Sequence, residues 1–196
     1  MADDKLQALS EQLPDGKNLS QPPLHPSQPP LPPSPPPLHL WHPELSGDID
    51  ILIKRDGSWI HEGRPILRPE LVKLFASIMR HEEDGEYYLL TPVEKWRLQV
   101  ECLPLLVIDF EIGTGAGGEQ QLTVTLNTER QYRVNCEHPL YLPELEQAQG
   151  IPAVELDYGL SALFGRAAWY RLAELCEESD KGTGVWSSGQ FWVIAD

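Results

Sequence analysis

Ten of the chain's 19 prolines lie between residues 21 and 40, and this cluster limits what the start of the chain can form. Each proline lacks a backbone N–H and holds φ at about −65°, so the interior of a helix or a sheet is excluded there. Such a segment adopts an extended polyproline II conformation instead. We therefore expect residues 1–37 to be a disordered proline-rich tail in front of the folded part.

The tail also contains the PxxP spacing that SH3-type domains bind. The spaced prolines are Pro26, Pro29, Pro32 and Pro35. Ligands of that kind usually carry a flanking arginine or lysine, and neither residue type occurs between Lys17 and Lys54. A semi-rigid spacer is therefore the favoured interpretation, and a contact with a protein partner is the alternative.

The remainder of the chain has the composition of a folded, acidic protein. Apolar residues make up 41% of the sequence, which includes six tryptophans, so a core can be buried. The formal net charge of −15 argues against binding bulk nucleic acid or an anionic membrane surface, because both need a basic face. The N-terminal sequence lacks the basic start of a signal peptide, and no apolar run reaches membrane-spanning length. We expect a cytoplasmic protein.

The three cysteines give no sign of a disulfide framework or a metal site. Cys102, Cys136 and Cys176 are far apart in the sequence and have apolar neighbours. We expect all three to be buried, inert thiols.

Residues 38–103 show a strand–helix–strand pattern. Ile49, Ile51 and Ile53 alternate with polar residues, as in a half-buried strand, and Asp56-Gly57 supplies a hairpin turn before a second strand. An amphipathic helix is expected to follow and to end at the glycine at position 85. Its apolar face comprises Leu71, Leu74, Phe75, Ile78 and Met79. Two short strands around a turn at 91–92 complete this half.

Residues 104–196 show a second pattern of the same kind. Alternation predicts strands over 108–112, 122–126, 132–134 and 154–158, with a loop over 138–150. A helix is expected from Leu160 to Glu178, and the closing segment GVWSSGQFWVIAD is expected to form one or two strands.

The two patterns suggest a duplication. Phe75 and Ile78 on the first predicted helix match Leu172 and Leu175 on the second at a constant spacing. The predicted fold class is α+β, with two related halves, 38–103 and 104–196. Each half is expected to be a small, mostly antiparallel sheet with one amphipathic helix.

Several chemical motifs are incomplete. Gly113, Gly115 and Gly118 satisfy GxGxxG, but a strand follows them, whereas a dinucleotide site needs a helix to begin there. They are expected to form a hairpin connection. The His-Glu pairs at 61–62 and 81–82 lack the second histidine of a zinc site, and no nucleophile motif occurs. The sequence therefore identifies no cofactor, metal site or catalytic residue.

A cationic set is the remaining candidate site. Arg64 and Arg68 precede the first predicted helix, and Lys95 stands beside Trp96 on a later strand. Helix N-termini attract anions through their unpaired N–H groups, so a small anion is a plausible ligand. Pairing of these cations with local carboxylates is the alternative interpretation. The candidate ligand-binding residues are Arg68, Lys95, Trp96, Arg166 and Trp186.

Six segments together resemble one bacterial family. They are GDIDILIKRDGSWIHEG, RPELVKLF, EDGEYYLLTPVEK, HPLYL, LSALFGRAAWYRLAEL and GVWSSGQFW. In order and spacing, over about 38–196, the chain resembles the family catalogued as domain of unknown function 1285. The resemblance implies a duplication, a C-terminal half superficially like a pleckstrin-homology fold, and a groove between the halves that holds a nucleotide-like ligand. It also implies a role in signal transduction, and no established enzymatic activity.

Two functions from different classes follow. The first is a sensor module, in which a nucleotide or other small anionic metabolite binds between the halves and a protein partner reads the change. The second is a protein-interaction adaptor without a small-molecule ligand, for which the proline-rich tail supplies a further contact. An enzyme of an unrecognised type is a third alternative.

Overall fold

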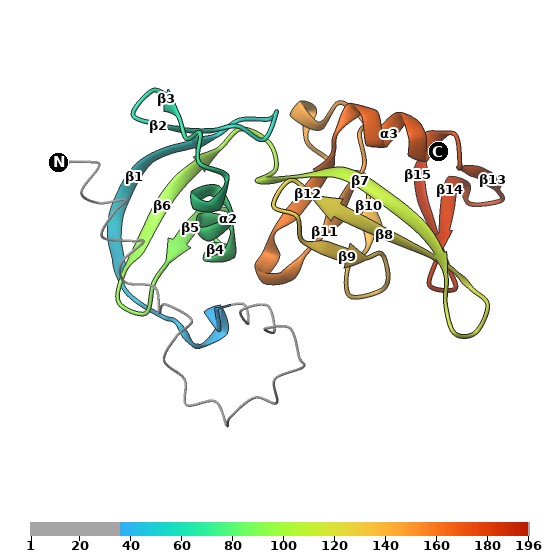
Figure 1. Ribbon diagram of the computed structural model, residues 1–196, viewed down its shortest axis with the longest axis horizontal. Helices are drawn as coiled ribbons and strands as arrows, with labels where there is room; N and C mark the ends of the chain where they lie inside the picture. The colour runs from blue at the N-terminus through green and yellow to red at the C-terminus, as the bar shows by residue number, and fades with distance from the viewer. Residues whose placement is uncertain (1–35, 196) are drawn as a thin grey trace, which may run out of the picture.

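The computed structural model describes residues 36–195, which form two mostly β halves side by side (Figure 1). The predicted tail lies outside the described residues, except for Pro36 and Pro37. A short 3-10 helix η1 (Leu38–Leu40) leads into the first half, and its Leu38 is fully buried. Leu38 therefore belongs to the core of the described residues.

The N-terminal half is a six-stranded sheet in the order β3-β2-β1-β6-β5-β4. Only its central pair, β1 and β6, is parallel. Its elements are β1 (Leu45–Ile53), β2 (Trp59–His61), β3 (Arg64–Pro65), α2 (Pro69–Ser77), β4 (Met79–His81), β5 (Tyr87–Leu90) and β6 (Lys95–Val100). Ile49, Ile51 and Ile53 are buried, as their alternation predicts, and Phe75 of α2 stacks on Trp59 with ring centroids 6.3 Å apart.

The C-terminal half contains a second six-stranded sheet, in the order β10-β11-β12-β7-β8-β9. Its elements are β7 (Leu105–Thr114), β8 (Gln120–Leu126), β9 (Gln131–Arg133), β10 (Leu140–Tyr141), η2 (Glu146–Ala148), β11 (Ala153–Glu155), η3 (Asp157–Gly159) and β12 (Ser161–Phe164). Helix α3 (Arg166–Ala173) and a three-stranded sheet of β13 (Glu177–Ser179), β14 (Gly182–Ser187) and β15 (Gln190–Ala195) follow. Strand β14 lies against β8, and β15 lies against β10.

The two six-stranded sheets have the same topology. In each, the first three strands form one antiparallel meander and the last three form another, and the first and sixth strands pair in parallel at the centre. This shared order supports the predicted duplication. The helices are not equivalent, however, because α2 connects the third and fourth strands of its sheet, whereas α3 follows the sixth strand of the other. The predicted match between the two helices is therefore wrong.

Both predicted helices are too long. The first ends at Ser77, because Ile78 and Met79 turn into strand pairing, with the N–H of Leu90 donating to the carbonyl of Ile78 over 2.9 Å. In the second, the apolar run Ser161–Phe164 is strand β12, where both sheet faces are covered. The predicted loop over 138–150 contains β10 and η2.

The cysteines are not all buried. Cys102 is buried, Cys176 is half-buried, and Cys136 is exposed in the loop after β9. Burial raises the pKa of the Cys102 thiol, which keeps it protonated. The glycine-rich segment after β7 is a hairpin connection, as predicted, because β7 and β8 pair antiparallel on either side of it.

Polar contacts join the two halves at separate places. The Nε–H of Arg55, in the turn after β1, donates to the carbonyl of Gln147 over 2.5 Å. The ammonium of Lys73 on α2 lies 2.8 Å from a carboxylate oxygen of Glu129, in the turn after β8. A cavity between the halves lies beside this second contact. Within residues 36–195, no helix has the length and apolar character needed to cross a membrane.

Candidate functional site

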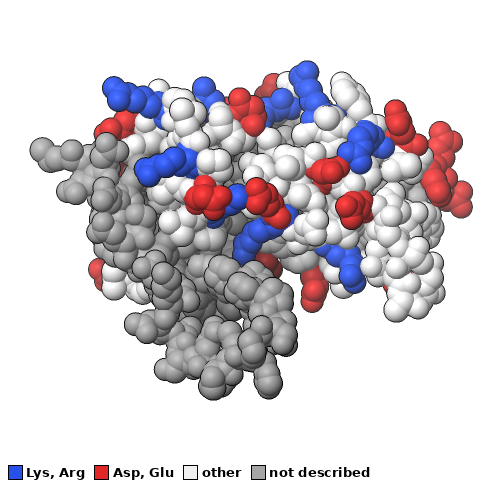
Figure 2. All heavy atoms as spheres, in the orientation of Figure 1, with Lys and Arg blue, Asp and Glu red and all other residues white. Residues whose placement is uncertain are grey.

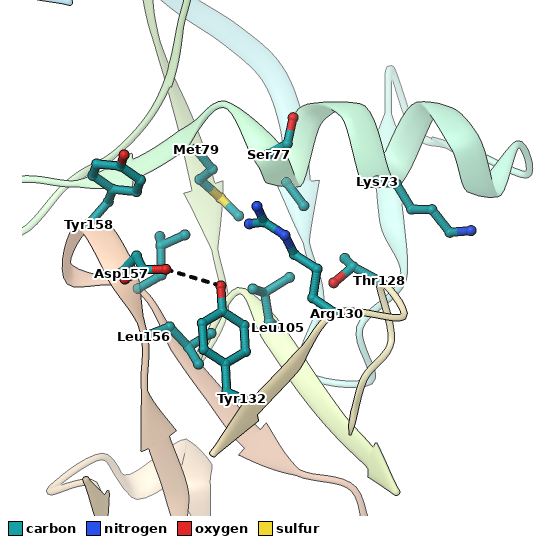
Figure 3. A pocket seen from close by; sticks show the side chains of 12 residues that line it. Lys73, Ser77, Met79, Leu105, Thr128, Arg130, Tyr132, Leu156, Asp157 and Tyr158 are labelled. Atoms are coloured by element: carbon teal, nitrogen blue, oxygen red, sulfur yellow. Dashed lines mark hydrogen bonds between the residues drawn. The ribbon is translucent and has the colours of Figure 1, made fainter. Parts of the chain in front are cut away.

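The cavity has a volume of about 100 Å³ and is lined by both halves (Figure 3). The N-terminal half supplies the C-terminal part of α2 and Met79 of β4. The C-terminal half supplies the β8–β9 turn, the start of β7 and the segment around η3. A molecule in this cavity would contact both halves at once.

The inner wall of the cavity is apolar. It is formed by Ala76, Met79, Leu105, Leu156 and Leu160, all of which are buried. These side chains come from both halves, so this wall is part of the core that joins them. It offers van der Waals contact to the apolar part of a ligand.

A buried hydroxyl faces the cavity without a hydrogen-bond partner. Thr128 is only 6% exposed, and no described residue accepts from or donates to its Oγ1. Figure 3 shows this oxygen on the side of Thr128 that faces Leu105 and Arg130. An unpaired buried hydroxyl costs about 1–3 kcal/mol, so a partner other than residues 36–195, such as water or a ligand, is expected for this group.

Two charged residues of opposite sign also line the cavity. The side chain of Arg130 extends from the β8–β9 turn toward Met79 and Ser77, and no described residue forms a hydrogen bond or an ion pair with its guanidinium (Figure 3). Asp157, in η3, accepts a hydrogen bond from the Tyr132 hydroxyl over 3.4 Å. By contrast, Lys73 points away from these groups and pairs with Glu70 and Glu129.

The Tyr132 ring is held in place on both sides. Its hydroxyl donates to Asp157, and the imidazole of His138 meets the ring edge-on, with centroids 4.9 Å apart. Burial raises the pKa of Tyr132, so the hydroxyl keeps its proton at neutral pH. The Nδ1 atom of His138 is also buried without a partner among the described residues.

The backbone of η3 lies very close to the N-terminal half. Tyr158 has φ +59° and Gly159 has φ +71°. A Cβ at Gly159 would lie 2.9 Å from the carbonyl oxygen of His81 at the end of β4. Glycine is therefore required here for the close approach of the two halves, and that approach places Asp157 and Tyr158 at the cavity.

The five residues predicted from the sequence lie elsewhere. The ammonium of Lys95 is 2.9 Å from Glu82 and lies over the Tyr88 ring, so for this cation the pairing alternative holds. Trp96 packs against Gly47 on β1. Arg68 immediately precedes α2, and its side chain has no ion pair within residues 36–195.

The remaining two belong to the C-terminal half. Arg166 is the first residue of α3, and Trp186 on β14 is 45% exposed beside Phe191, with ring centroids 5.3 Å apart. Strands β6 and β14 lie at opposite ends of the molecule, so Lys95 and Trp186 are not brought together (Figure 1). The described cavity is lined by none of the five predicted residues.

The surface charge over the described face is uneven. Figure 2 shows acidic side chains gathered at the end of the molecule that carries β13. Glu174, Glu177, Glu178 and Asp180 in this region are all exposed. Repulsion from these carboxylates disfavours polyanions at that end.

The fold and the cavity define a duplicated β-sheet protein with a small cavity between its halves. Residues 36–103 match the model described as "Domain of unknown function (DUF1285), N-terminal domain", and residues 104–194 match "Protein of unknown function (DUF1285), C-terminal domain". The chain belongs to the DUF1285 family.

Two solved structures from this family are similar to the chain. A DUF1285 family protein from Silicibacter pomeroyi DSS-3 is 40% identical, with a TM-score of 0.76, over 82% of this chain and 87% of that one. A DUF1285 family protein from Shewanella baltica OS155 is 32% identical, with a TM-score of 0.52, over 64% of this chain and 91% of that one. No curated protein matches the chain.

Proposed function

We propose that this protein is a small-ligand sensor module that acts in signal transduction, with its binding site in the cavity between the halves. The observation that carries the proposal is the Thr128 hydroxyl, which is 6% exposed, has no partner within residues 36–195 and lies at the cavity. A ligand that accepts or donates a hydrogen bond there removes the cost of the unpaired group.

The position of the cavity suggests how a protein partner would detect that a ligand is bound. Because α2 and β4 form one side and the β8–β9 turn and η3 form the other, a ligand stabilises the arrangement in which the halves are closely packed. A protein partner that contacts both halves would then bind the liganded form more tightly. The pleckstrin-homology-like surface expected for the C-terminal half is part of this proposal.

The volume of the cavity limits the size of the ligand that it can enclose. At about 100 Å³, it is smaller than the roughly 300–1,000 Å³ of sites that enclose drug-sized molecules. A nucleotide would be enclosed only in part, whereas a small anionic metabolite fits within. Arg130 supplies the charge for such an anion.

The test is a thermal-shift screen of the full chain with a library of metabolites and nucleotides. A ligand at about 100 times its Kd stabilises the protein by about 2.7 kcal/mol, which corresponds to a shift of several degrees. The cavity variant is Thr128→Val, which keeps the shape and removes the hydroxyl. Its matched control is Thr123→Val, on β8 outside the cavity.

We expect Thr128→Val to leave the unliganded protein as stable as before, or more stable by up to about 1 kcal/mol, because the hydroxyl has no partner to lose. It should reduce or abolish the ligand-induced shift, and Thr123→Val should keep it. The double variant Arg68→Ala and Lys95→Ala should also keep the shift relative to its own baseline. A shift lost in that double variant and kept in Thr128→Val would assign the ligand to the cations predicted from the sequence.

The adaptor alternative makes the opposite prediction. If no compound shifts the melting temperature and a specific protein partner binds the unliganded chain with unchanged affinity in Thr128→Val, the sensor proposal is wrong.

A further inference from the structure

Building on the proposed function, we infer that the cavity ligand is a small zwitterion: a free amino acid with an apolar side chain. Its carboxylate would be held by Arg130 and Thr128, and its ammonium by Asp157. The inference rests on three features of the cavity: two separated opposite charges, one unpaired buried hydroxyl, and an apolar wall.

The charges are the first feature. Arg130 and Asp157 are both solvent-exposed residues that line the same cavity, and no nitrogen of the guanidinium comes within 4.0 Å of the carboxylate. Opposite charges that share a cavity without pairing leave room for a molecule that carries both complementary charges. A zwitterion satisfies each group with its own partner, whereas a simple anion leaves Asp157 unpaired and close to the bound negative charge.

The hydroxyls are the second feature. Thr128 Oγ1 has no partner within residues 36–195 and faces the side on which Arg130 lies (Figure 3), so it can donate to a ligand carboxylate that the guanidinium also attracts. The Tyr132 hydroxyl donates to Asp157 and orients this carboxylate, which retains further lone pairs for an ammonium. The two ends of the ligand are thus recognised by different elements of the C-terminal half.

The apolar wall is the third feature. Met79, Leu105, Leu156 and Leu160 are all buried and line the cavity between these polar groups. The N-terminal half contributes Met79 and Ala76, so an aliphatic side chain would contact both halves. We therefore expect an apolar amino acid to bind more tightly than a small polar one.

The same features disfavour a nucleotide. A triphosphate carries several negative charges, and Arg130 faces it alone, because Lys73 already pairs with Glu70 and Glu129. Asp157 at the opposite side of the cavity repels a polyanion. The charges of the cavity therefore favour a small zwitterion over a nucleotide.

Isothermal titration of the full chain with L-leucine, L-isoleucine and L-methionine tests the inference. Two matched probes accompany them: 4-methylpentanoate, which is leucine without its ammonium, and 3-methylbutylamine, which lacks the carboxylate. Because both charged residues are solvent-exposed, each charge contributes about 1 kcal/mol, and each probe should bind about 3- to 10-fold more weakly than leucine.

The variants Arg130→Gln and Asp157→Asn assign the two ends of the ligand. Arg130→Gln should weaken the binding of leucine about 3- to 10-fold and leave that of 3-methylbutylamine nearly unchanged. Asp157→Asn should weaken leucine similarly and leave 4-methylpentanoate unchanged or tighter. Arg133→Gln, on β9 outside the cavity, is the control and should change nothing.

The outcomes separate this inference from the proposed function. If none of the three amino acids binds, or if the two charge variants weaken both single-charge probes alike, the inference is overturned. Binding of a nucleotide or inorganic phosphate that Thr128→Val abolishes would overturn it too, and would leave the proposed site intact.

Discussion

The Lys73 ammonium lies 2.8 Å from Glu129 and 3.0 Å from Glu70, so one cation of α2 is shared between its own helix and the opposite half. The Glu129 pair crosses the boundary between the halves beside the cavity, whereas the Glu70 pair stays within one turn of helix. The hydrogen bond from Lys73 to Glu129 is the main cause that raises the pKa of this lysine.

The first prediction concerns this shared lysine. In a double-mutant cycle with Lys73→Met and Glu129→Gln, the coupling free energy should be favourable and should fall in 1 M salt, where the screening length is about 3 Å. The melting temperature of each variant and its affinity for a cavity ligand should be measured. The parallel cycle with Glu70→Gln is the control, and its coupling should leave ligand affinity unaffected because the Lys73–Glu70 pair lies within α2.

The second prediction concerns a carboxylate between two cations. Glu82 accepts hydrogen bonds from Arg80 and Lys95, whose side chains are both 18% exposed. Burial alone would raise the pKa of Glu82, but the hydrogen bonds from Arg80 and Lys95 outweigh it and hold the pKa below its usual value. Glu82→Gln should lower the free energy of unfolding by about 1–3 kcal/mol at pH 7.

The pH dependence of that loss has a defined sign. Because the folded pKa is depressed, the stabilisation by Glu82 is fully present above its unfolded pKa of about 4.3 and disappears as the pH falls through the lower folded value. In urea titrations, the free energies of unfolding of the wild-type protein and Glu82→Gln should therefore converge as the pH falls below about 4. A difference that stays constant from pH 7 to pH 3 would contradict the assignment.

The third prediction concerns a buried serine in the C-terminal half. Ser187 is fully buried, donates from Oγ to the carbonyl of Val134 over 2.6 Å, and accepts from the N–H of Leu122 over 3.0 Å. Ser187→Ala should cost about 1–3 kcal/mol, since it leaves the buried N–H of Leu122 unpaired and removes one of the two hydroxyl hydrogen bonds to the carbonyl of Val134. Ser188→Ala, which removes one hydrogen bond from a half-buried residue, should cost less in the same denaturation experiment.

The fourth prediction concerns the turn between β1 and β2. Gly57 has φ +80°, and a Cβ there would lie 2.8 Å from Leu106 Cδ1 in the other half. Gly63 has φ +72°, and a Cβ there would meet nothing within 4 Å. Gly63→Ala should cost about 1–2 kcal/mol from the backbone alone, and Gly57→Ala should cost more because its Cβ also displaces the Leu106 side chain of the other half. Equal losses in the free energy of unfolding would show that the β1–β2 turn does not stabilise the contact between the halves.

Local pattern was sufficient for most strands. Alternation over Ile49–Ile53 and Leu122–Leu126 predicts them correctly, because one face of each is buried. The pattern failed at Met79. The helical period of the apolar residues continues through this position in the sequence, but in the structure Met79 pairs with Leu89 in the sheet. It failed again at Ser161–Phe164, since a short apolar run buried on both faces does not distinguish helix from strand.

The cavity residues could not be predicted from the sequence. Thr128 and Arg130 belong to an ordinary hairpin turn, and Asp157 belongs to a short 3-10 helix, with no motif linking them. They meet because β12 pairs with β7 while β9 pairs with β8. The cationic set was predicted from local charge, and for Lys95 the ion pair with Glu82 satisfies that charge within its own half.

The shared topology has a consequence for folding kinetics. Ile53 pairs with Val100, and Phe164 pairs with Val107, so the centre of each sheet joins the two ends of its half. Neither central pair can form until the intervening meanders have brought those ends together, and closing so long a loop costs entropy before any contact repays it. Each half should therefore fold in one cooperative step, in milliseconds or longer. A nascent chain on the ribosome cannot complete the second half before β12 has emerged.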